Sequence, residues 1–326
     1  MKAITHEKYG PPAVLEIKEI PTPTPGDDEL LIEIHAAAVN SGDWRTVQGE
    51  PFLLRLAVGV FRPKKLMIGA DMAGRVIEVG KNVTQFKVGD EVFGDLSGQK
   101  YGAFAEFVTV PEDAVWHKPK NLSFQQAAAI PETGAVAYHS LVEKGQIKSD
   151  DKVLIVGASG GIGTFAVQIS KAFGAEVTAV CSTRNIELVS SIGADYVIDY
   201  TEKDFPAVDG QWDLIVATAG FHTPEEFRNA LTSTGICVIA GGDLKQLSQM
   251  MLKGKRLSEK GGRTLTYLSH HPVQSEIIRL AEMAERGKIK PVIDRIFPFE
   301  QTADAIAYYG KGKSRGKVVI EIRSEA

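Results

Sequence analysis

Cysteine, long apolar runs and an excess of one charge are all scarce in this 326-residue chain. Its two cysteines, Cys181 and Cys237, are too few for a disulfide framework or a cysteine-rich zinc site, so a reducing cytoplasmic location is expected. No run approaches the roughly 18 apolar residues that a membrane span needs, and the first residues lack the apolar stretch of a signal peptide. Lys plus Arg number 37 and Asp plus Glu 41, a net charge of −4. This balance argues against nucleic acid or a membrane as the main partner.

Length and texture predict two domains. Up to about residue 124, short β-type segments such as residues 30–36, 74–80, 89–94 and 103–110 alternate with Pro- and Gly-rich turns, which is typical of a β-barrel or sandwich. From about residue 125, apolar runs alternate with helical segments, which predicts a parallel sheet with helices on both faces. The six candidate strands are residues 153–156, 177–180, 196–198, 214–217, 236–240 and 264–268. The tail, with helices at 275–286 and 302–309 and a strand at 317–322, fits either domain by texture.

The strongest motif is Gly157-Ala158-Ser159-Gly160-Gly161-Ile162-Gly163, between an apolar strand and a helical segment. In this setting glycines let the backbone turn tightly beside a pyrophosphate, and the helix N-terminus supplies unpaired N–H groups. The spacing departs from G-x-G-x-x-G because Ala158 stands at the first glycine position. The motif predicts a dinucleotide site; the alternative is a glycine-rich turn that holds no ligand.

The end of the second strand of this domain indicates which cofactor fits. An NAD site places Asp or Glu there to hold the ribose hydroxyls, whereas this chain has Cys181-Ser182-Thr183-Arg184-Asn185. A hydroxyl and a guanidinium are donors that suit a 2′-phosphate. NADP(H) is therefore predicted; the alternative is that Arg184 merely opens the next helix on a solvated face.

Together with the first half, these residues resemble the medium-chain dehydrogenase/reductase superfamily and its zinc-independent, zeta-crystallin-like quinone oxidoreductase branch. The landmarks, spread over nearly the whole chain, are Asn40-Ser41-Gly42-Asp43-Trp44, residues 69–74, 88–92 and 102–108, and the glycine motif. The resemblance implies an α/β protein in which residues 1–124 and 268–326 form a GroES-like β-barrel domain for the substrate. Residues 125–267 would form a Rossmann doubly wound parallel-sheet domain that binds NADP. A homodimer is also implied.

The resemblance implies the site residues as well. Asn40 and Asp43 would be the catalytic residues, beside the nicotinamide and the substrate. The pyrophosphate would lie on Ser159, Gly160, Gly161 and Ile162; the 2′-phosphate on Ser182, Arg184 and Tyr200; and the nicotinamide ribose on Thr218, Ala219, Gly220, Gly241 and Gly242. Lys317 matches a basic position near the cofactor. Two departures are Asn185, where the family usually has lysine, and Val136, where relatives often have threonine.

No metal is expected, because zinc-dependent relatives have cysteine near Asn40 and a His-Glu pair where this chain has Ala70-Asp71. Hydride transfer from a nicotinamide needs mainly positioning, so NADPH-dependent reduction of a quinone is favoured. The first alternative is reduction of an enone or alkenal double bond, whose enolate needs a donor such as the Asn40 amide. An alternative of another class is a non-catalytic, NADPH-binding sensor or interaction protein, because fold does not fix function.

Several of these side chains also have a purely structural interpretation. Asn40 and Asp43 are residue types that favour turns and helix caps, and Asp71 is expected to be structural. Tyr101 could face the substrate, but it precedes a glycine and is expected at the rim of the substrate site. His270-His271 is not expected to bind a metal, because adjacent side chains point apart. Residues 52–61 form an apolar insertion that would either pack in the core or cover an aromatic substrate as a lid.

Overall fold

The computed structural model describes residues 1–52, 54–64, 67–99, 101–203, 205, 210–258, 261–269 and 273–324. The chain divides into two compact units. The first unit comprises Met1–Glu132, His271–Glu285 and Pro291–Ala326, and the second comprises Thr133–His270 and Arg286–Lys290. Most of the tail therefore belongs to the first unit, which is built from separate stretches of the chain.

A seven-stranded sheet forms most of the first unit's described part, in the order β14-β15-β3-β4-β5-β7, with β6 paired to β3. The strands of this sheet are β3 (Glu29–Val39), β4 (Asp71–Val79), β5 (Glu91–Asp95), β6 (Phe107–Pro111), β7 (Trp116–His117), β14 (Ile293–Pro298) and β15 (Lys317–Glu321). A separate hairpin pairs β1 (Lys2–Thr5) with β2 (Glu16–Glu19). The helices of this unit are α1 (Ser41–Gln48), α2 (Leu54–Val58), α3 (Phe124–Ala128), α9 (Gln274–Glu285) and α10 (Thr302–Gly310).

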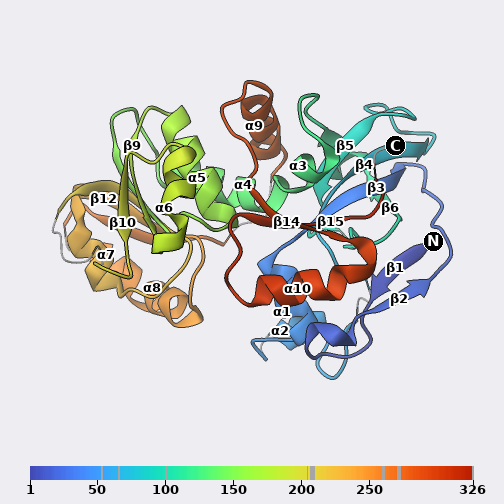
Figure 1. Ribbon diagram of the computed structural model, residues 1–326, viewed down its shortest axis with the longest axis horizontal. Helices are drawn as coiled ribbons and strands as arrows, with labels where there is room; N and C mark the ends of the chain where they lie inside the picture. Colours follow the sequence, from blue (N-terminus) through green and yellow to red (C-terminus); the bar gives the residue numbers. More distant parts are fainter. Residues whose placement is uncertain are drawn as a thin grey trace. The chain divides into compact units, whose positions relative to one another are not determined.

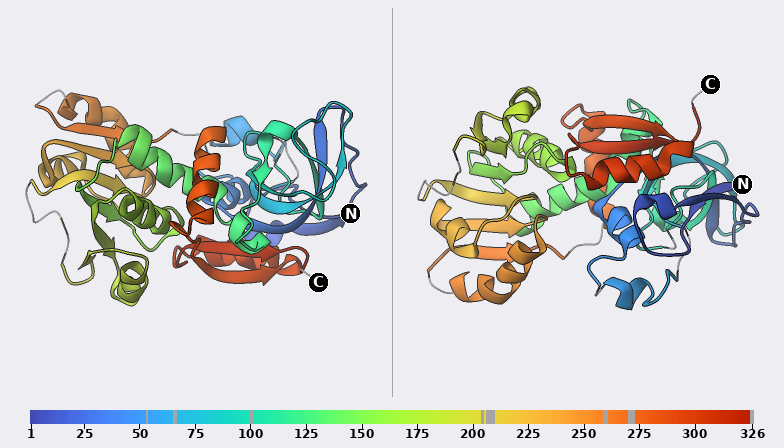
Figure 2. Two further views of the ribbon diagram at one scale, coloured as in Figure 1. Left: turned by 90° about the horizontal axis from the view of Figure 1, so that it is seen from above. Right: turned by 60° about the horizontal axis from the view of Figure 1, so that its bottom comes forward.

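The tail of the chain completes this sheet beside β3. Along one edge of β3, residues 29–33 pair with β6 and residues 36–39 pair with β15, while β4 runs along the other edge. Helix α10 packs against β14 and β15, as Figures 1 and 2 show. The chain's last strand is thereby held beside the C-terminal half of β3, directly before Asn40.

The described part of the second unit forms a six-stranded parallel sheet in the order β10-β9-β8-β11-β12-β13. Its strands are β8 (Lys152–Val156), β9 (Glu176–Cys181), β10 (Tyr196–Asp199), β11 (Trp212–Ala217), β12 (Leu231–Ile239) and β13 (Thr264–Tyr267). Its helices are α5 (Gly161–Ala172), α6 (Ile186–Ser191), α7 (Pro224–Ala230) and α8 (Leu244–Ser258), and α4 (Pro131–Tyr138) leads into it. The order reverses between β8 and β11, so right-handed crossovers place α5 and α6 on one face and α7 and α8 on the other (Figure 1).

The two-domain α/β prediction is confirmed, and all six predicted strands of the parallel sheet are present. Their apolar runs are continuous because helices cover both faces; Val153, Leu154 and Ile155 are all fully buried. The capping boxes of Ser123 with Gln126 and of Thr223 with Glu226 also form. The sequence pattern does not predict strand β14.

Three large apolar side chains of the insertion at residues 52–61 are exposed. Phe52, Leu56 and Phe61 are 62%, 61% and 95% exposed, so core packing, one of the two interpretations of this segment, does not hold for these side chains. Residue 53 lies outside the described part of the chain. Among the described residues, no helix combines the length and the apolar character needed to cross a membrane.

Candidate active site

The predicted dinucleotide residues gather at one edge of the second unit's sheet, where the carboxyl ends of parallel strands meet. The loop after β8 is tied to the end of β9, because Gly157 N and Ala158 N both donate to Val180 O at 3.1 Å. The loop after β11 is tied to the same place, because the Thr218 hydroxyl donates to the carbonyl oxygens of Val156 and Gly157 at 3.0 and 3.2 Å. This is the edge at which open α/β sheets bind ligands.

The glycines of the motif meet different steric demands. Gly157 has φ 82°, and a Cβ there would lie 2.6 Å from Ala219 Cβ. A Cβ on Gly163 would lie 2.2 Å from Gly157 O, so this glycine lets α5 pack closely against the loop. A Cβ on Gly160 would meet nothing nearer than Gly157 O at 3.5 Å. Gly160, the N-cap of α5, therefore leaves open space in front of a helix N-terminus, which fits a pyrophosphate.

Asn185 joins the two loops predicted to hold phosphates. It is 4% exposed, and its Nδ2 donates to Ser159 Oγ at 2.8 Å and to Ser182 Oγ at 3.2 Å. Its Oδ1 is buried without a hydrogen-bond partner among the described residues. A lysine in its place would add a positive charge to the site. From the sequence alone, Asn185 indicates only that the positive charge of the family's usual lysine is missing.

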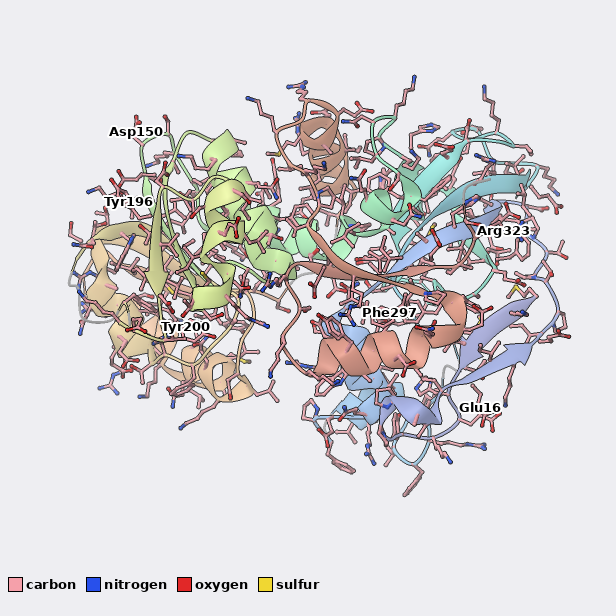
Figure 3. The ribbon with its side chains drawn as sticks, viewed as in Figure 1. Glu16, Asp150, Tyr196, Tyr200, Phe297 and Arg323 are labelled. Atoms are coloured by element: carbon pink, nitrogen blue, oxygen red, sulfur yellow. The ribbon has the colours of Figure 1, made fainter. Side chains whose placement is uncertain are left out.

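Apart from Lys317, which belongs to the first unit, the remaining predicted cofactor residues lie on the same edge. Arg184 is exposed after β9, and Tyr200, 56% exposed, follows β10 at the surface (Figure 3). Gly241 N donates to Ala217 O at 3.2 Å, and a Cβ on Gly241 would lie 2.6 Å from Thr218 O. The loops that carry Thr218, Ala219, Gly220, Gly241 and Gly242 are therefore in close contact.

The predicted catalytic residues Asn40 and Asp43 lie in the first unit, at the start of α1. Asn40 is the N-cap, and its backbone N–H donates to Asp43 Oδ2 at 2.8 Å, so the structural interpretation of both residues as cap residues is correct as far as it goes. Asp43 Oδ1 also accepts from Gly69 N at 3.2 Å. Both side chains are at most 3% exposed. Cap residues on a surface helix need no such burial.

A buried ammonium holds the Asn40 side chain. Lys317, the first residue of β15, is 2% exposed; its Nζ donates to Asn40 Oδ1 and, at 3.2 Å, to Asp71 Oδ2. Asp71 Oδ1 accepts from Glu132 N at 3.0 Å. Lysine can only donate, so Asn40 must turn its oxygen toward Lys317 and its amide nitrogen away. That nitrogen is buried and reaches no hydrogen-bond partner among the described residues.

Burial controls the acids around this lysine. It raises the pKa of Asp43 to about 7, against the effect of the Asn40 N–H. It raises the pKa of Asp71 to about 6, against the effect of Lys317. It also raises the pKa of Glu132 well above its usual range, and the charge of Asp71 adds to that shift. These buried carboxyl groups therefore take up protons at higher pH than exposed carboxyl groups do.

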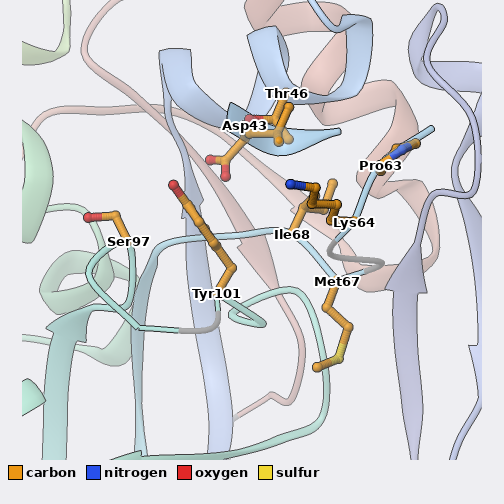
Figure 4. A pocket seen from close by; sticks show the side chains of 9 residues that line it. Asp43, Thr46, Pro63, Lys64, Met67, Ile68, Ser97 and Tyr101 are labelled. Carbon is orange, nitrogen blue, oxygen red and sulfur yellow. The ribbon is translucent and has the colours of Figure 1, made fainter. Parts of the chain in front are cut away.

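A cavity of about 290 Å³ in the first unit lies beside Asp43 (Figure 4). Its apolar lining consists of Val58, Pro63, Met67 and Ile68, and its polar lining consists of Asp43, Thr46, Lys64, Ser97 and Tyr101. Tyr101 is expected at a rim, but its side chain runs along the cavity wall toward Asp43 (Figure 4). Val58 belongs to α2, so one end of the exposed apolar insertion borders the cavity, which favours its interpretation as a lid.

Metal ligands are a separate question. Within the described ranges, no three His, Cys, Asp or Glu side chains are grouped so that they could hold a metal ion. The pair His270-His271 lies outside the described residues.

Comparison with known proteins identifies the family. A model of the alcohol dehydrogenase GroES-like domain matches residues 26–120, and one described as zinc-binding dehydrogenase matches residues 192–320. The chain is 32% identical to the chloroplast envelope quinone oxidoreductase homolog of Arabidopsis thaliana over 335 residues, with 98% of each chain covered. It belongs to the medium-chain dehydrogenase/reductase superfamily.

Two further similarities support this assignment. The 2-methylene-furan-3-one reductase of Solanum lycopersicum is 34% identical, with 98% of this chain and 79% of the relative covered. The solved structure of the quinone oxidoreductase from Coxiella burnetii superposes with a TM-score of 0.87 at 30% identity, and 99% of each chain is covered. The chain is thus a quinone oxidoreductase-like oxidoreductase of the medium-chain dehydrogenase/reductase superfamily, with the expected GroES-like and Rossmann domains.

Proposed function

We propose that this medium-chain dehydrogenase/reductase is an NADPH-dependent quinone reductase that works without zinc. The observation that carries the cofactor assignment is the end of β9, where Ser182 and Arg184 stand and residues 181–185 include no acid. An acid there would bind the ribose hydroxyls of NAD and repel a 2′-phosphate. When bound, the reduced nicotinamide supplies a hydride. The names of the relatives support a nicotinamide cofactor in general, and Arg184 supports NADPH in particular.

The chain's own residues bind the cofactor and orient it toward the substrate. In this proposal the backbone N–H groups from Ser159 to Ile162 hold the pyrophosphate, and Ser182, Arg184 and Tyr200 surround the 2′-phosphate. Asn185 keeps the Ser159 and Ser182 hydroxyls in place between them. Thr218, Ala219, Gly220, Gly241 and Gly242 line the nicotinamide ribose. Asn40 and Asp43 are proposed to lie beside the nicotinamide and the substrate, and Lys317, which holds the Asn40 side chain, is proposed to lie near the cofactor.

The acceptor is proposed to be a quinone for two reasons. The relatives from A. thaliana and C. burnetii are named quinone oxidoreductases. The cavity beside Asp43 combines four apolar residues with several polar groups, which suits a small, uncharged ring that carries carbonyl oxygens. A quinone accepts hydride readily and its reduced form can take a proton from water, so the reaction requires mainly positioning.

The donor set around Asp71 supports the proposal that the protein works without zinc. Zinc in proteins is held by thiolate, imidazole and carboxylate ligands. Here the single carboxylate of Asp71 already bonds to the Lys317 ammonium and to a backbone N–H, and its other neighbour is the Asn40 amide. A cation in the middle of the cluster repels a metal ion. These residues do not fit a catalytic zinc.

Enone reduction is the second candidate. The tomato relative is named for 2-methylene-furan-3-one, in which a carbon–carbon double bond is conjugated to a ketone. The buried Asn40 amide and the polar groups in the cavity are donors that an enolate oxygen would need.

The test is NADPH oxidation, with NADH in parallel, against an ortho-quinone, a para-quinone and an enone. Arg184→Ala should raise the KM for NADPH by about 10- to 100-fold, the value of a charge-assisted contact, and leave the KM for NADH unchanged. Arg256→Ala, a change at an exposed arginine of α8, is the matched control. Equal use of both cofactors by the unaltered protein contradicts the NADPH assignment, and turnover of the enone alone moves the reaction to double-bond reduction. Saturable NADPH binding without any turnover favours a sensor.

Assembly and location complete the proposal. We propose a homodimer in the cytoplasm. Light scattering after size exclusion should give twice the 35.3 kDa of one chain; the mass of a single chain would contradict it.

A further inference from the structure

Tyr101 lines the cavity beside Asp43, and its phenolic hydroxyl can donate a proton. It lies between β5 and β6, and its hydroxyl and the Asp43 carboxyl point toward one another across the cavity (Figure 4). Its φ of 60° is in the left-handed region, which is uncommon for a residue with a side chain and costs conformational energy. The surrounding backbone must therefore hold it there.

One residue, Gly69, positions both Tyr101 and Asp43. Gly69 N donates to Asp43 Oδ1 at 3.2 Å, and Gly69 O accepts from the N–H groups of Gly102 and Ala103, each at 3.1 Å. Tyr101 N itself donates to Leu96 O at 3.3 Å. The residue after Tyr101 and the carboxyl group of Asp43 are thus bonded to opposite ends of the same residue. This arrangement fixes the tyrosine against the acid rather than leaving it at a mobile rim.

The order of the pKa values of Tyr101 and Asp43 favours proton transfer from the Asp43 carboxyl to a Tyr101 phenolate. Burial raises the pKa of the Tyr101 hydroxyl above its usual value, and the Asp43 charge raises it further. The pKa of Asp43 is about 7, because burial outweighs the two backbone N–H bonds that it accepts. Tyr101 is therefore protonated at neutral pH, and a tyrosinate formed there would take a proton from Asp43 in a downhill step.

We propose that Tyr101 donates a proton to the carbonyl oxygen of an enone bound in this cavity, and that Asp43 then returns a proton to Tyr101. This inference rests on the proposed reductase function and makes the enone a substrate class of the same site. It assigns a catalytic role to a residue that the resemblance does not single out.

The step balances. Hydride addition to the β-carbon, from the nicotinamide cofactor of the proposed function, moves the double-bond electrons onto the carbonyl oxygen as an enolate. The Tyr101 O–H bond breaks and an O–H bond forms on that oxygen, which gives an enol. The tyrosinate takes the carboxyl proton of Asp43, and Asp43 regains a proton from water. The enol rearranges to the saturated ketone in solution. A quinone needs no such donor, because its reduced form takes up a proton from water.

The kinetic test compares enone and quinone turnover in the variants Tyr101→Phe and Tyr308→Phe. Tyr101→Phe should lower kcat for an enone by about 100-fold or more relative to kcat for a quinone, the usual contribution of a general acid, and Tyr308→Phe should leave both values unchanged. Tyr308→Phe is the matched control, because its hydroxyl donates to Asp294 Oδ2 at 2.7 Å and it does not line the cavity. Equal losses with the enone and the quinone, or no loss with either, would overturn the proposal. If kcat for the enone falls in Lys64→Met but not in Tyr101→Phe, Lys64 is the proton donor and the proposal is overturned.

The pH profile tests Asp43. The charged and titratable groups around Asp43 are Asp71 of β4, Lys317 of β15, Glu132 of α4, Tyr309 of α10, and Tyr101 and Lys64, which line the same cavity. The pKa of about 7 for Asp43 already includes the effects of Asp71 and Lys317, the two charged side chains that shift it most. Enone kcat should fall as pH rises through about 7, where Asp43 loses its proton, and Asp43→Asn should be slow at every pH. An Asp43→Asn profile that still falls through pH 7 would show that another group reloads Tyr101.

A binding test without cofactor separates this inference from the proposed function. The probe is 4-nitrophenol, which at pH 7 is present partly as its phenolate, an aromatic oxyanion like the enolate, and the absorbance of the phenolate reports binding. Its Kd should rise about 10- to 100-fold in Tyr101→Phe, the value of a hydrogen bond to a charged group, and stay unchanged in Tyr308→Phe. If the protein reduces nothing but this Kd shift appears, the proposed function fails while the anion contact stands. If it reduces enones but neither kinetics nor Kd responds to Tyr101→Phe, the function stands and the proton donor is wrong.

Discussion

Replacement of Lys317 by methionine removes the cation from the buried cluster and leaves Asp71 without its ion pair. Both partners are almost completely buried, at 2% and 0% side-chain exposure, and their N···O distance is 3.2 Å. At that separation the attraction is about 5 kcal/mol for an effective dielectric constant of 20 and about 1.3 kcal/mol in water. Desolvation offsets much of the attraction, but removal of one partner of a buried pair costs about 3–5 kcal/mol, because the other charge stays behind.

Proton uptake by Asp71 limits that cost. A carboxyl group with an unfolded pKa of about 3.9 can be neutralised in the folded state for about 1.4 kcal/mol per pH unit, hence about 5.6 kcal/mol at pH 8 and about 1.5 kcal/mol at pH 5. The full loss of about 3–5 kcal/mol is therefore expected at pH 8, and about 1.5 kcal/mol or less at pH 5. Burial has already raised the pKa of Asp71 to about 6, and loss of Lys317 raises it further.

The assay is urea unfolding at both pH values in a Trp212→Phe background. Trp44 and Trp116 then report on the first unit, to which Lys317 belongs. Lys81→Met is the control: the Lys81–Asp27 pair is shorter, at 2.8 Å, but its side chains are 72% and 59% exposed, so at most about 1 kcal/mol should be lost. Equal losses for the two variants at pH 8, or a Lys317→Met loss that does not depend on pH, would refute the reasoning.

Three further outcomes are expected. Gly160→Ala should keep the melting temperature but weaken cofactor binding about tenfold or more, whereas Gly163→Ala should destabilise the second unit, because its Cβ would lie 2.2 Å from Gly157 O; calorimetry and cofactor titration separate the two, and unchanged binding in Gly160→Ala would contradict the pyrophosphate assignment. Asp43→Asn should remove part of the loss of stability between pH 4 and 7, because a group whose folded pKa of about 7 exceeds its unfolded value stabilises less as pH rises; an unchanged slope in urea unfolding against pH contradicts this. Cys181 and Cys237, at most 1% exposed, should react with a thiol reagent only on unfolding, and rapid labelling of the native protein would contradict their burial.

The fold can be predicted from the sequence where local pattern and tertiary environment agree. The strands of the parallel sheet are apolar throughout because both faces are covered, and the glycine motif occupies the turn that requires it. Strand β14 escapes prediction because it lies at an edge of its sheet and Asp294 and Arg295 interrupt its apolar residues. Edge strands tolerate such charges, so their sequences carry little periodic signal.

The site is harder to predict because its partners are distant in sequence. Lys317 meets Asn40 and Asp71 across 277 and 246 residues, and only the pairing of β15 with β3 brings them together. Tyr101 is expected at a rim because its positive φ, and hence its direction, cannot be deduced from residue type. A weak signal is present in Gly102, which also has positive φ and continues the bend that turns Tyr101 inward. Asn185 looks like a lost charge in the sequence, and its bridging role needs the geometry of two loops.

The way that β15 completes the first unit also sets an order of events during synthesis. The strands of the second unit lie in one continuous stretch of the chain, so their sheet can close as soon as β13 has left the ribosome. The first unit is made earlier but matures later. Until the ribosome has passed Glu321, residues 36–39 of β3 remain an open edge and Asp71 has no counter-ion. A nascent chain arrested before this point would carry a finished nucleotide-binding sheet and an unfinished barrel, and the barrel is the part that a chaperone would have to protect.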